Sequence, residues 1–209
     1  KRGQQPLPEN ADYVVVEFKE DPDGNPGKWL EAVDTKLYTR SWGGPVYGSM
    51  RGSTAPDQMQ LWFPIFEKAW AQFDGSDQKP GDYKSIGDGG QSSRLFQILL
   101  GRPALDEDFN ASSKDRCFQI IKDKLARKLP VCLGTKDDKG NEAVFANTGV
   151  YGDHTYTVLD AYEKNGVKYV KLRNPWGESE PAGNGANDGI FDLKLDDMPK
   201  WYSVLWSVE

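Results

Sequence analysis

His154 is the only histidine among the 209 residues. Any histidine-based proton transfer or metal ligation must therefore use this side chain. The two cysteines, Cys117 and Cys132, are too few for a disulfide framework or a zinc cluster. A pair of unmodified thiols is compatible with the cytosol but does not establish a compartment.

The dipeptide Asn165-Gly166 predicts a β-hairpin around this histidine. It separates two runs rich in apolar residues, 154–162 and 167–173. With a loop of two residues or slightly more, antiparallel pairing places His154 opposite a residue between 174 and 177. Provided that the strands do not bulge, His154 and Asn174 should therefore meet near the open end of the hairpin.

A histidine beside a side-chain amide is suited to the chemistry of papain-like sites. There the histidine takes a proton from a thiol, and the asparagine carbonyl orients the imidazole. The alternative is that the histidine has no catalytic role, because a lone histidine at the start of a strand is more often an ordinary surface or core residue. The pair alone leaves both interpretations open.

The remaining elements predict a mixed α and β chain with mostly antiparallel strands. Residues 11–19 and 28–34 are expected to form a hairpin, and residues 61–73 and 113–128 to form amphipathic helices. The Gly-rich polar stretch 74–97 is expected to be irregular. Further strands are expected at 131–133, 154–162, 167–173, 190–195 and 202–208.

Charge and hydropathy exclude several kinds of partner. The formal net charge is −6, which argues against nucleic acid, because phosphate backbones require clustered Lys and Arg. No apolar run approaches the roughly 20 residues that a membrane span needs, so no membrane partner is expected. The chain begins at Lys1 without a signal-like segment, and we expect it to be a piece of a longer protein.

Several motifs resemble the calpain family of cysteine proteases. Asn174-Pro-Trp-Gly-Glu178 is similar to the family's asparagine strand, and His154-Thr-Tyr-Thr-Val158 to its histidine strand. The similarity extends upstream and downstream through segments 34–39, 61–70 and 188–191, although Tyr38 stands where the family has proline. The resemblance covers the chain from about Ala11. It implies an α+β, papain-like half-domain of antiparallel sheets flanked by a few helices at 11–209, with an arm or linker at 1–10.

The resemblance also implies roles for individual residues. His154 would be the general base and later the acid, Asn174 its orienting partner, and Trp176 the aromatic residue bordering the substrate cleft. The family's nucleophile lies in a separate Cys-bearing subdomain, whose motif is absent here. Cys117 and Cys132 are interpreted as small core residues. The implied function is hydrolysis of internal peptide bonds in polypeptide substrates once that subdomain is present, and the isolated chain should be inactive.

The implied metal site is incomplete. No cofactor is required for this chemistry, but calpains bind calcium in this half, and Glu180 and Asp188 match two of the family's acidic ligands. Ile190 stands where a third acid is expected, and the acidic loop is short. Because calcium needs six or more oxygens, such a site should bind weakly.

Two other functions fit the sequence. Calpain-like halves can persist as non-catalytic scaffolds or partner-binding modules, which a parent protein without the upstream cysteine would favour. The chain could also belong to a secreted effector whose parent delivers the protease. Neither the preferred peptide nor the oligomeric state follows from these residues.

Overall fold

The computed structural model describes residues 12–39, 41, 62–74, 83–87, 89–181 and 186–209. The chain divides into two compact units, one of residues 1–90 with 98–101 and one of residues 91–97 with 102–209. The division expected from the sequence, an arm at 1–10 and one subdomain at 11–209, stays a prediction. The arm itself lies outside the described residues.

The first unit contains an aromatic core between a hairpin and a helix. Its elements are β1 (Tyr13–Glu20), β2 (Pro26–Asp34), α1 (Trp62–Asp74) and α2 (Lys84–Gly87). The antiparallel β1–β2 pair and α1 confirm the predicted hairpin and first helix. Phe18 is fully buried, and its ring lies 4.5 Å from that of Phe73, which stacks on Trp70 at 5.4 Å.

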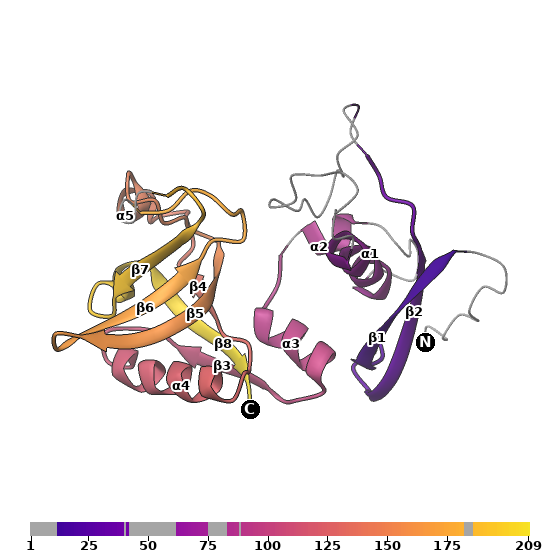
Figure 1. The fold of residues 1–209 in the computed structure, drawn as a ribbon, viewed down its shortest axis with the longest axis horizontal. Helices are drawn as coiled ribbons and strands as arrows, with labels where there is room; N and C mark the ends of the chain where they lie inside the picture. The colour runs from indigo at the N-terminus through magenta and orange to yellow at the C-terminus, as the bar shows by residue number, and fades with distance from the viewer. Residues whose placement is uncertain (1–11, 40, 42–61, 75–82, 88, 182–185) are drawn as a thin grey trace. The chain divides into compact units, whose positions relative to one another are not determined.

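The second unit is a six-stranded antiparallel sheet in the order β3-β8-β4-β5-β6-β7. Its elements are β3 (Ala104–Asp108), α4 (Lys114–Ala126), β4 (Cys132–Thr135), α5 (Glu142–Phe145), β5 (Thr155–Lys164), β6 (Val167–Arg173), β7 (Ile190–Lys194), the 3-10 turn η2 (Met198–Lys200) and β8 (Tyr202–Val208). The helix α4 runs along one face of this sheet (Figure 1). The α+β class with antiparallel sheets is therefore confirmed.

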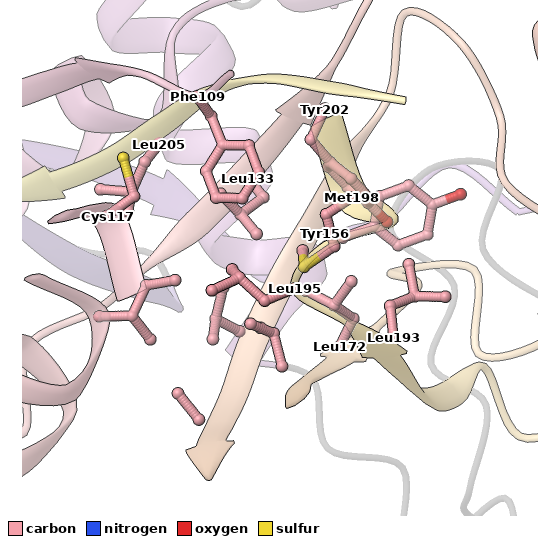
Figure 2. Close-up of a cluster of buried hydrophobic side chains, with 14 of the residues drawn as sticks. Phe109, Cys117, Leu133, Tyr156, Leu172, Leu193, Leu195, Met198, Tyr202 and Leu205 are labelled. Atoms are coloured by element: carbon pink, nitrogen blue, oxygen red, sulfur yellow. The ribbon is translucent and has the colours of Figure 1, made fainter. Parts of the chain in front are cut away.

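The core of this unit lies between the sheet and α4 (Figure 2). The helix contributes Cys117, Phe118 and Ile121, and alternating strand residues contribute many of the others. Phe145 of α5, Met198 of η2 and loop residues complete the cluster. Tyr156 and Tyr202 are the largest of the fully buried side chains.

Across the part of the chain that the structure describes, no helix is long and apolar enough to cross a membrane.

A register shift in β5 explains an unusual burial pattern. Tyr156 and Val158 are buried at even positions, whereas Ala161 is buried at an odd position and Leu159 is 40% exposed. The β5–β6 pairing shifts between Val158 and Asp160, which is a β-bulge. Because a bulge inserts one extra residue, it moves the following side chains to the opposite face of the sheet.

The secondary structure differs from the sequence prediction in several places, among them the short helix α5, which was not predicted. The prediction that 74–97 is irregular is wrong at α2 and at α3 (Ser92–Leu100), where the Gly-rich segment ends and an amphipathic helix begins. The strand β3 was not predicted, because its sequence Ala-Leu-Asp-Glu-Asp is mostly acidic. It is an edge strand of the sheet, where charged residues are common.

Candidate active site

The β5–β6 hairpin brings His154 and Asn174 together. Its two-residue turn, Asn165-Gly166, has φ angles of 53° and 74°, the left-handed values that this turn type requires. Lys164 pairs with Val167, and the pairing continues away from the turn. His154 immediately precedes β5 and Asn174 immediately follows β6, so both lie at the open end, as the hairpin predicts.

Thr135 of the neighbouring strand β4 holds the backbone of His154. The Thr135 N–H donates to the His154 carbonyl at 2.9 Å, and the His154 N–H donates to Thr135 Oγ1 at 2.9 Å. The Thr135 hydroxyl donates to the same carbonyl at 3.0 Å. Both the N–H and the carbonyl of His154 are therefore hydrogen-bonded, which fixes the backbone that carries the imidazole.

Asn174 orients the imidazole and is itself fixed in orientation. His154 Nε2 lies 2.9 Å from Asn174 Oδ1. Asn174 is fully buried, and its Nδ2 donates to the carbonyls of Glu178 and Ser179, each at 2.9 Å. Because those acceptors require the amide nitrogen, Oδ1 must face the histidine. Nε2 then carries the imidazole proton, and Nδ1 keeps the lone pair that can accept another.

Three aromatic rings surround the imidazole. Trp176, which is 49% exposed, lies with its ring centroid 4.4 Å from that of His154. Tyr156 meets the imidazole edge-on at 4.9 Å. Tyr151 lies 6.4 Å away and contacts Trp176 at 4.8 Å. The imidazole is therefore packed among aromatic rings while its Nε2 is bound to Asn174.

Burial lowers the pKa of His154 below its ordinary value, and the hydrogen bond to Asn174 offsets part of this effect. The imidazole is therefore neutral at pH 7. A neutral imidazole with Nε2 protonated can accept a proton at Nδ1. This arrangement suits a general base.

A pocket of about 460 Å³ opens beside the imidazole. It is lined by the pre-histidine loop (residues 136–153) together with His154 and Trp176. The side chains along it include three acids, Asp138, Glu142 and Asp153. The backbone N–H of Gly140 donates to Glu142 and holds the pKa of that carboxyl below its usual range. The histidine and three carboxyl groups therefore line the same pocket.

The pre-histidine loop is bound to other segments of the same unit. Trp201 Nε1 donates to the carbonyl of Val144 at 3.0 Å. Gly149 packs so closely on the post-asparagine loop (residues 175–181) that an added Cβ would lie 2.5 Å from the Glu180 carbonyl oxygen. The two loops that flank the histidine and asparagine therefore support each other.

Both cysteines are buried packing residues. Cys117 is fully buried in α4, and its thiol donates to the Asp108 carbonyl at 3.4 Å. Burial raises the pKa of the Cys117 thiol and raises that of Cys132 to about 11. Thiols with such pKa values stay protonated at neutral pH, which disfavours nucleophilic attack. This agrees with their interpretation as core residues.

The two acids expected to bind calcium do not form a metal centre by themselves. Glu180 has a buried carboxylate oxygen, Oε2, to which none of the described residues donates a hydrogen bond, whereas Asp188 Oδ1 accepts the Ile190 N–H at 2.9 Å. Among the described residues, no three His, Cys, Asp or Glu side chains gather around one point. Within the described residues, these two carboxylates therefore supply only part of the six or more oxygens that calcium needs.

Sequence reasoning missed the parts played by Tyr151, Tyr156 and Thr135. A signal existed for Tyr156, because residues two apart in a strand share a face and it lies two positions after His154. Tyr151 and Thr135 offered no such signal, since their contacts depend on how the pre-histidine loop and β4 pack.

Comparisons with known proteins agree on one family. A sequence profile described as calpain family cysteine protease matches residues 25–189. Human calpain-7 is 24% identical over 184 residues, which cover 76% of this chain and 22% of calpain-7. The rat calpain-1 catalytic subunit is 30% identical over 177 aligned residues, and the match covers 81% of this chain and 23% of the relative. The maize calpain-type cysteine protease DEK1 is 26% identical over 182 aligned residues, and the match covers 84% of this chain and 7% of DEK1.

The chain thus spans less than a quarter of the length of these curated relatives. The family profile nevertheless matches most of its residues and includes both His154 and Asn174. The chain belongs to the calpain family of cysteine proteases.

Proposed function

We propose that this chain supplies the histidine and asparagine of a calpain-type endopeptidase that hydrolyses internal peptide bonds. The nucleophile would come from a Cys-bearing subdomain outside these 209 residues. The observation that supports the proposal most strongly is the bond between His154 Nε2 and Asn174 Oδ1, with the asparagine amide fixed by two carbonyls. It leaves Nδ1 as the proton acceptor.

In the proposed reaction, the thiol proton passes to Nδ1 of His154 and the thiolate attacks the peptide carbonyl carbon. The C–N bond breaks, and the imidazolium returns its proton to the leaving amine. Water then attacks the acyl-thioester while His154 accepts its proton, the C–S bond breaks, and the imidazolium returns the proton to the thiolate. The products are a carboxylic acid, the free amine and the regenerated thiol. This sequence needs no cofactor, and the polypeptide would bind in extended form beside Trp176.

The test is peptide cleavage by a protein that contains this chain and the Cys-bearing subdomain. His154→Ala should lower kcat/KM at least about a thousandfold, because the general base is lost. Asn174→Ala should cause a smaller loss, roughly tenfold or more, because the imidazole loses its orientation. Leu159→Ala is the matched control, since Leu159 is exposed at the bulge of the same strand. Undiminished cleavage by His154→Ala would refute the proposal.

Calcium dependence is measured in the same assay. We expect cleavage to persist with a calcium chelator, because Glu180 and Asp188 alone offer too few oxygens to hold the ion. If the folded protein cleaves nothing with or without calcium, the chain is better described as a non-catalytic scaffold or partner-binding module.

A further inference from the structure

A buried tyrosine hydroxyl connects the histidine strand to the pre-histidine loop. Tyr156 lies two residues after His154, and its side chain is fully buried in the core (Figure 2). Its ring meets the imidazole edge-on at 4.9 Å. Its hydroxyl accepts the backbone N–H of Tyr151 at 3.0 Å. One side chain thus contacts the imidazole and holds the backbone of the loop that leads to it.

The loop residue held in this way carries one of the rings at the imidazole. Tyr151 packs on Trp176 at 4.8 Å, and Trp176 packs on His154 at 4.4 Å. Between Tyr151 and His154 the backbone has no regular structure, and Asp153 has a positive φ of 47°. The Asp153 N–H donates to the Lys136 carbonyl at 3.0 Å and so holds the end of this segment, whereas the hydroxyl of Tyr156 holds its start.

The hydroxyl is suited to this task over a wide pH range. Burial raises the pKa of Tyr156 to about 12, so the group stays neutral while the imidazole titrates. The ring is also held from its other sides, because it contacts Phe191 at 5.6 Å and Tyr202 at 5.7 Å. Its position is therefore set by the core rather than by the loop.

We infer that Tyr156 is a positioning residue for the histidine. Its hydroxyl holds Tyr151 in place, and Tyr151 in turn holds the Trp176 ring against the imidazole. The geometric part of this inference concerns the chain alone, whereas its meaning for catalysis rests on the proposed function.

The test replaces the hydroxyl and keeps the ring. In Tyr156→Phe, hydrogen exchange of the Tyr151 amide should accelerate roughly five- to tenfold, because one hydrogen bond is lost. The titration midpoint of His154 should move up toward its ordinary value, since the imidazole becomes more hydrated. Nuclear magnetic resonance measures both quantities, and the single histidine makes its titration unambiguous.

Tyr202→Phe is the matched control. Tyr202 is also fully buried and contacts the Tyr156 ring, but its hydroxyl has no hydrogen-bond partner among the described residues. Removing that hydroxyl should leave both the Tyr151 exchange rate and the His154 midpoint unchanged. The inference is overturned if Tyr156→Phe behaves like the parent chain, or if Tyr202→Phe changes both quantities equally.

Cleavage by the protein that includes the Cys-bearing subdomain separates this inference from the proposed function. In that protein, Tyr156→Phe should lower kcat/KM roughly three- to tenfold. It should also move the acid limb of the pH profile of kcat/KM to higher pH. If His154→Ala leaves cleavage unchanged, the proposed function fails, while the exchange and titration results still decide whether Tyr156 positions the histidine. An unchanged kcat/KM and pH profile in Tyr156→Phe, with His154→Ala inactive, would refute the catalytic part of the inference.

Discussion

Gly149 and Glu180 lie in backbone contact, because a Cβ built on Gly149 would be 2.5 Å from the Glu180 carbonyl oxygen. Gly149 also has a φ of 77°, a backbone conformation that residues other than glycine rarely adopt. The first residue belongs to the pre-histidine loop and the second to the post-asparagine loop. Their contact is therefore one place where the supports of His154 and Asn174 depend on each other.

Gly149→Ala should be more destabilising than Gly140→Ala. Gly140 lies in the same loop and has a similar φ of 85°, but an added Cβ there would meet nothing within 4 Å. Both changes should cost about 1–2 kcal/mol for the left-handed backbone. Gly149→Ala should cost about 1–3 kcal/mol more for the steric overlap. Urea unfolding of both variants measures the difference, and equal free energies of unfolding would contradict this account.

Asn174→Asp should lower the free energy of unfolding by about 2–4 kcal/mol at pH 7. An oxygen would replace the amide nitrogen that donates to the Glu178 and Ser179 carbonyls, in a side chain that is fully buried. Asn110→Asp is the matched control, because Asn110 Oδ1 accepts the backbone N–H groups of Ser112 and Ser113. A carboxylate accepts those bonds equally well, so the control should change stability by less than about 0.5 kcal/mol. A tolerated Asn174→Asp would show that the asparagine amide is not fixed as described.

Cys117 and Cys132 should react slowly with iodoacetamide in the folded chain. Both thiols are buried, and burial raises their pKa values, to about 11 for Cys132. At pH 8 we expect alkylation to be about a hundredfold or more slower than in the same chain unfolded by urea. Mass spectrometry of the alkylated chain follows both sites. A cysteine that reacts as fast in the folded chain would be an activated thiol, and would become a candidate nucleophile.

The meeting of His154 and Asn174 could be predicted because it depends on local signals. The Asn165-Gly166 turn sets the pairing, and antiparallel geometry extends it to the open end of the hairpin. The bulge between Val158 and Asp160 shifts that pairing by one residue without separating the two side chains. The condition of strands without a bulge was therefore not met, yet the two side chains meet because the shift is only one residue.

The interactions that fix the site could not be predicted in the same way. The Asn174 amide is bound by carbonyls of the post-asparagine loop, whose path is set by packing against Gly149. The link from Tyr156 to Tyr151 likewise joins a strand to a loop without regular structure. Such backbone contacts depend on tertiary packing, which a pattern of residue types does not specify. The strand β3 was missed for a related reason, since its place at the sheet edge tolerates an acidic sequence.

The stability of the chain should depend on pH through His154. Burial lowers the pKa of His154 in the folded chain below the ordinary value of 6.5, which the unfolded chain keeps. At a pH below 6.5 the unfolded chain therefore binds more protons, and acidification favours unfolding. The stabilisation by neutral His154 is fully present above pH 6.5 and is lost as the pH falls through the lower folded pKa.

His154→Gln isolates this contribution, because it removes the titrating group and leaves every carboxyl group in place. Urea unfolding of both proteins between pH 5 and 8 gives the difference in their free energies of unfolding at each pH. We expect the parent's advantage over the variant to be constant above about pH 7 and to decrease steadily below pH 6.5. An advantage that grows on acidification would mean that the folded chain binds the proton more tightly than the unfolded chain. The imidazole would then be stabilised as a cation, and burial by Trp176 and its neighbours would not be the dominant influence on its charge.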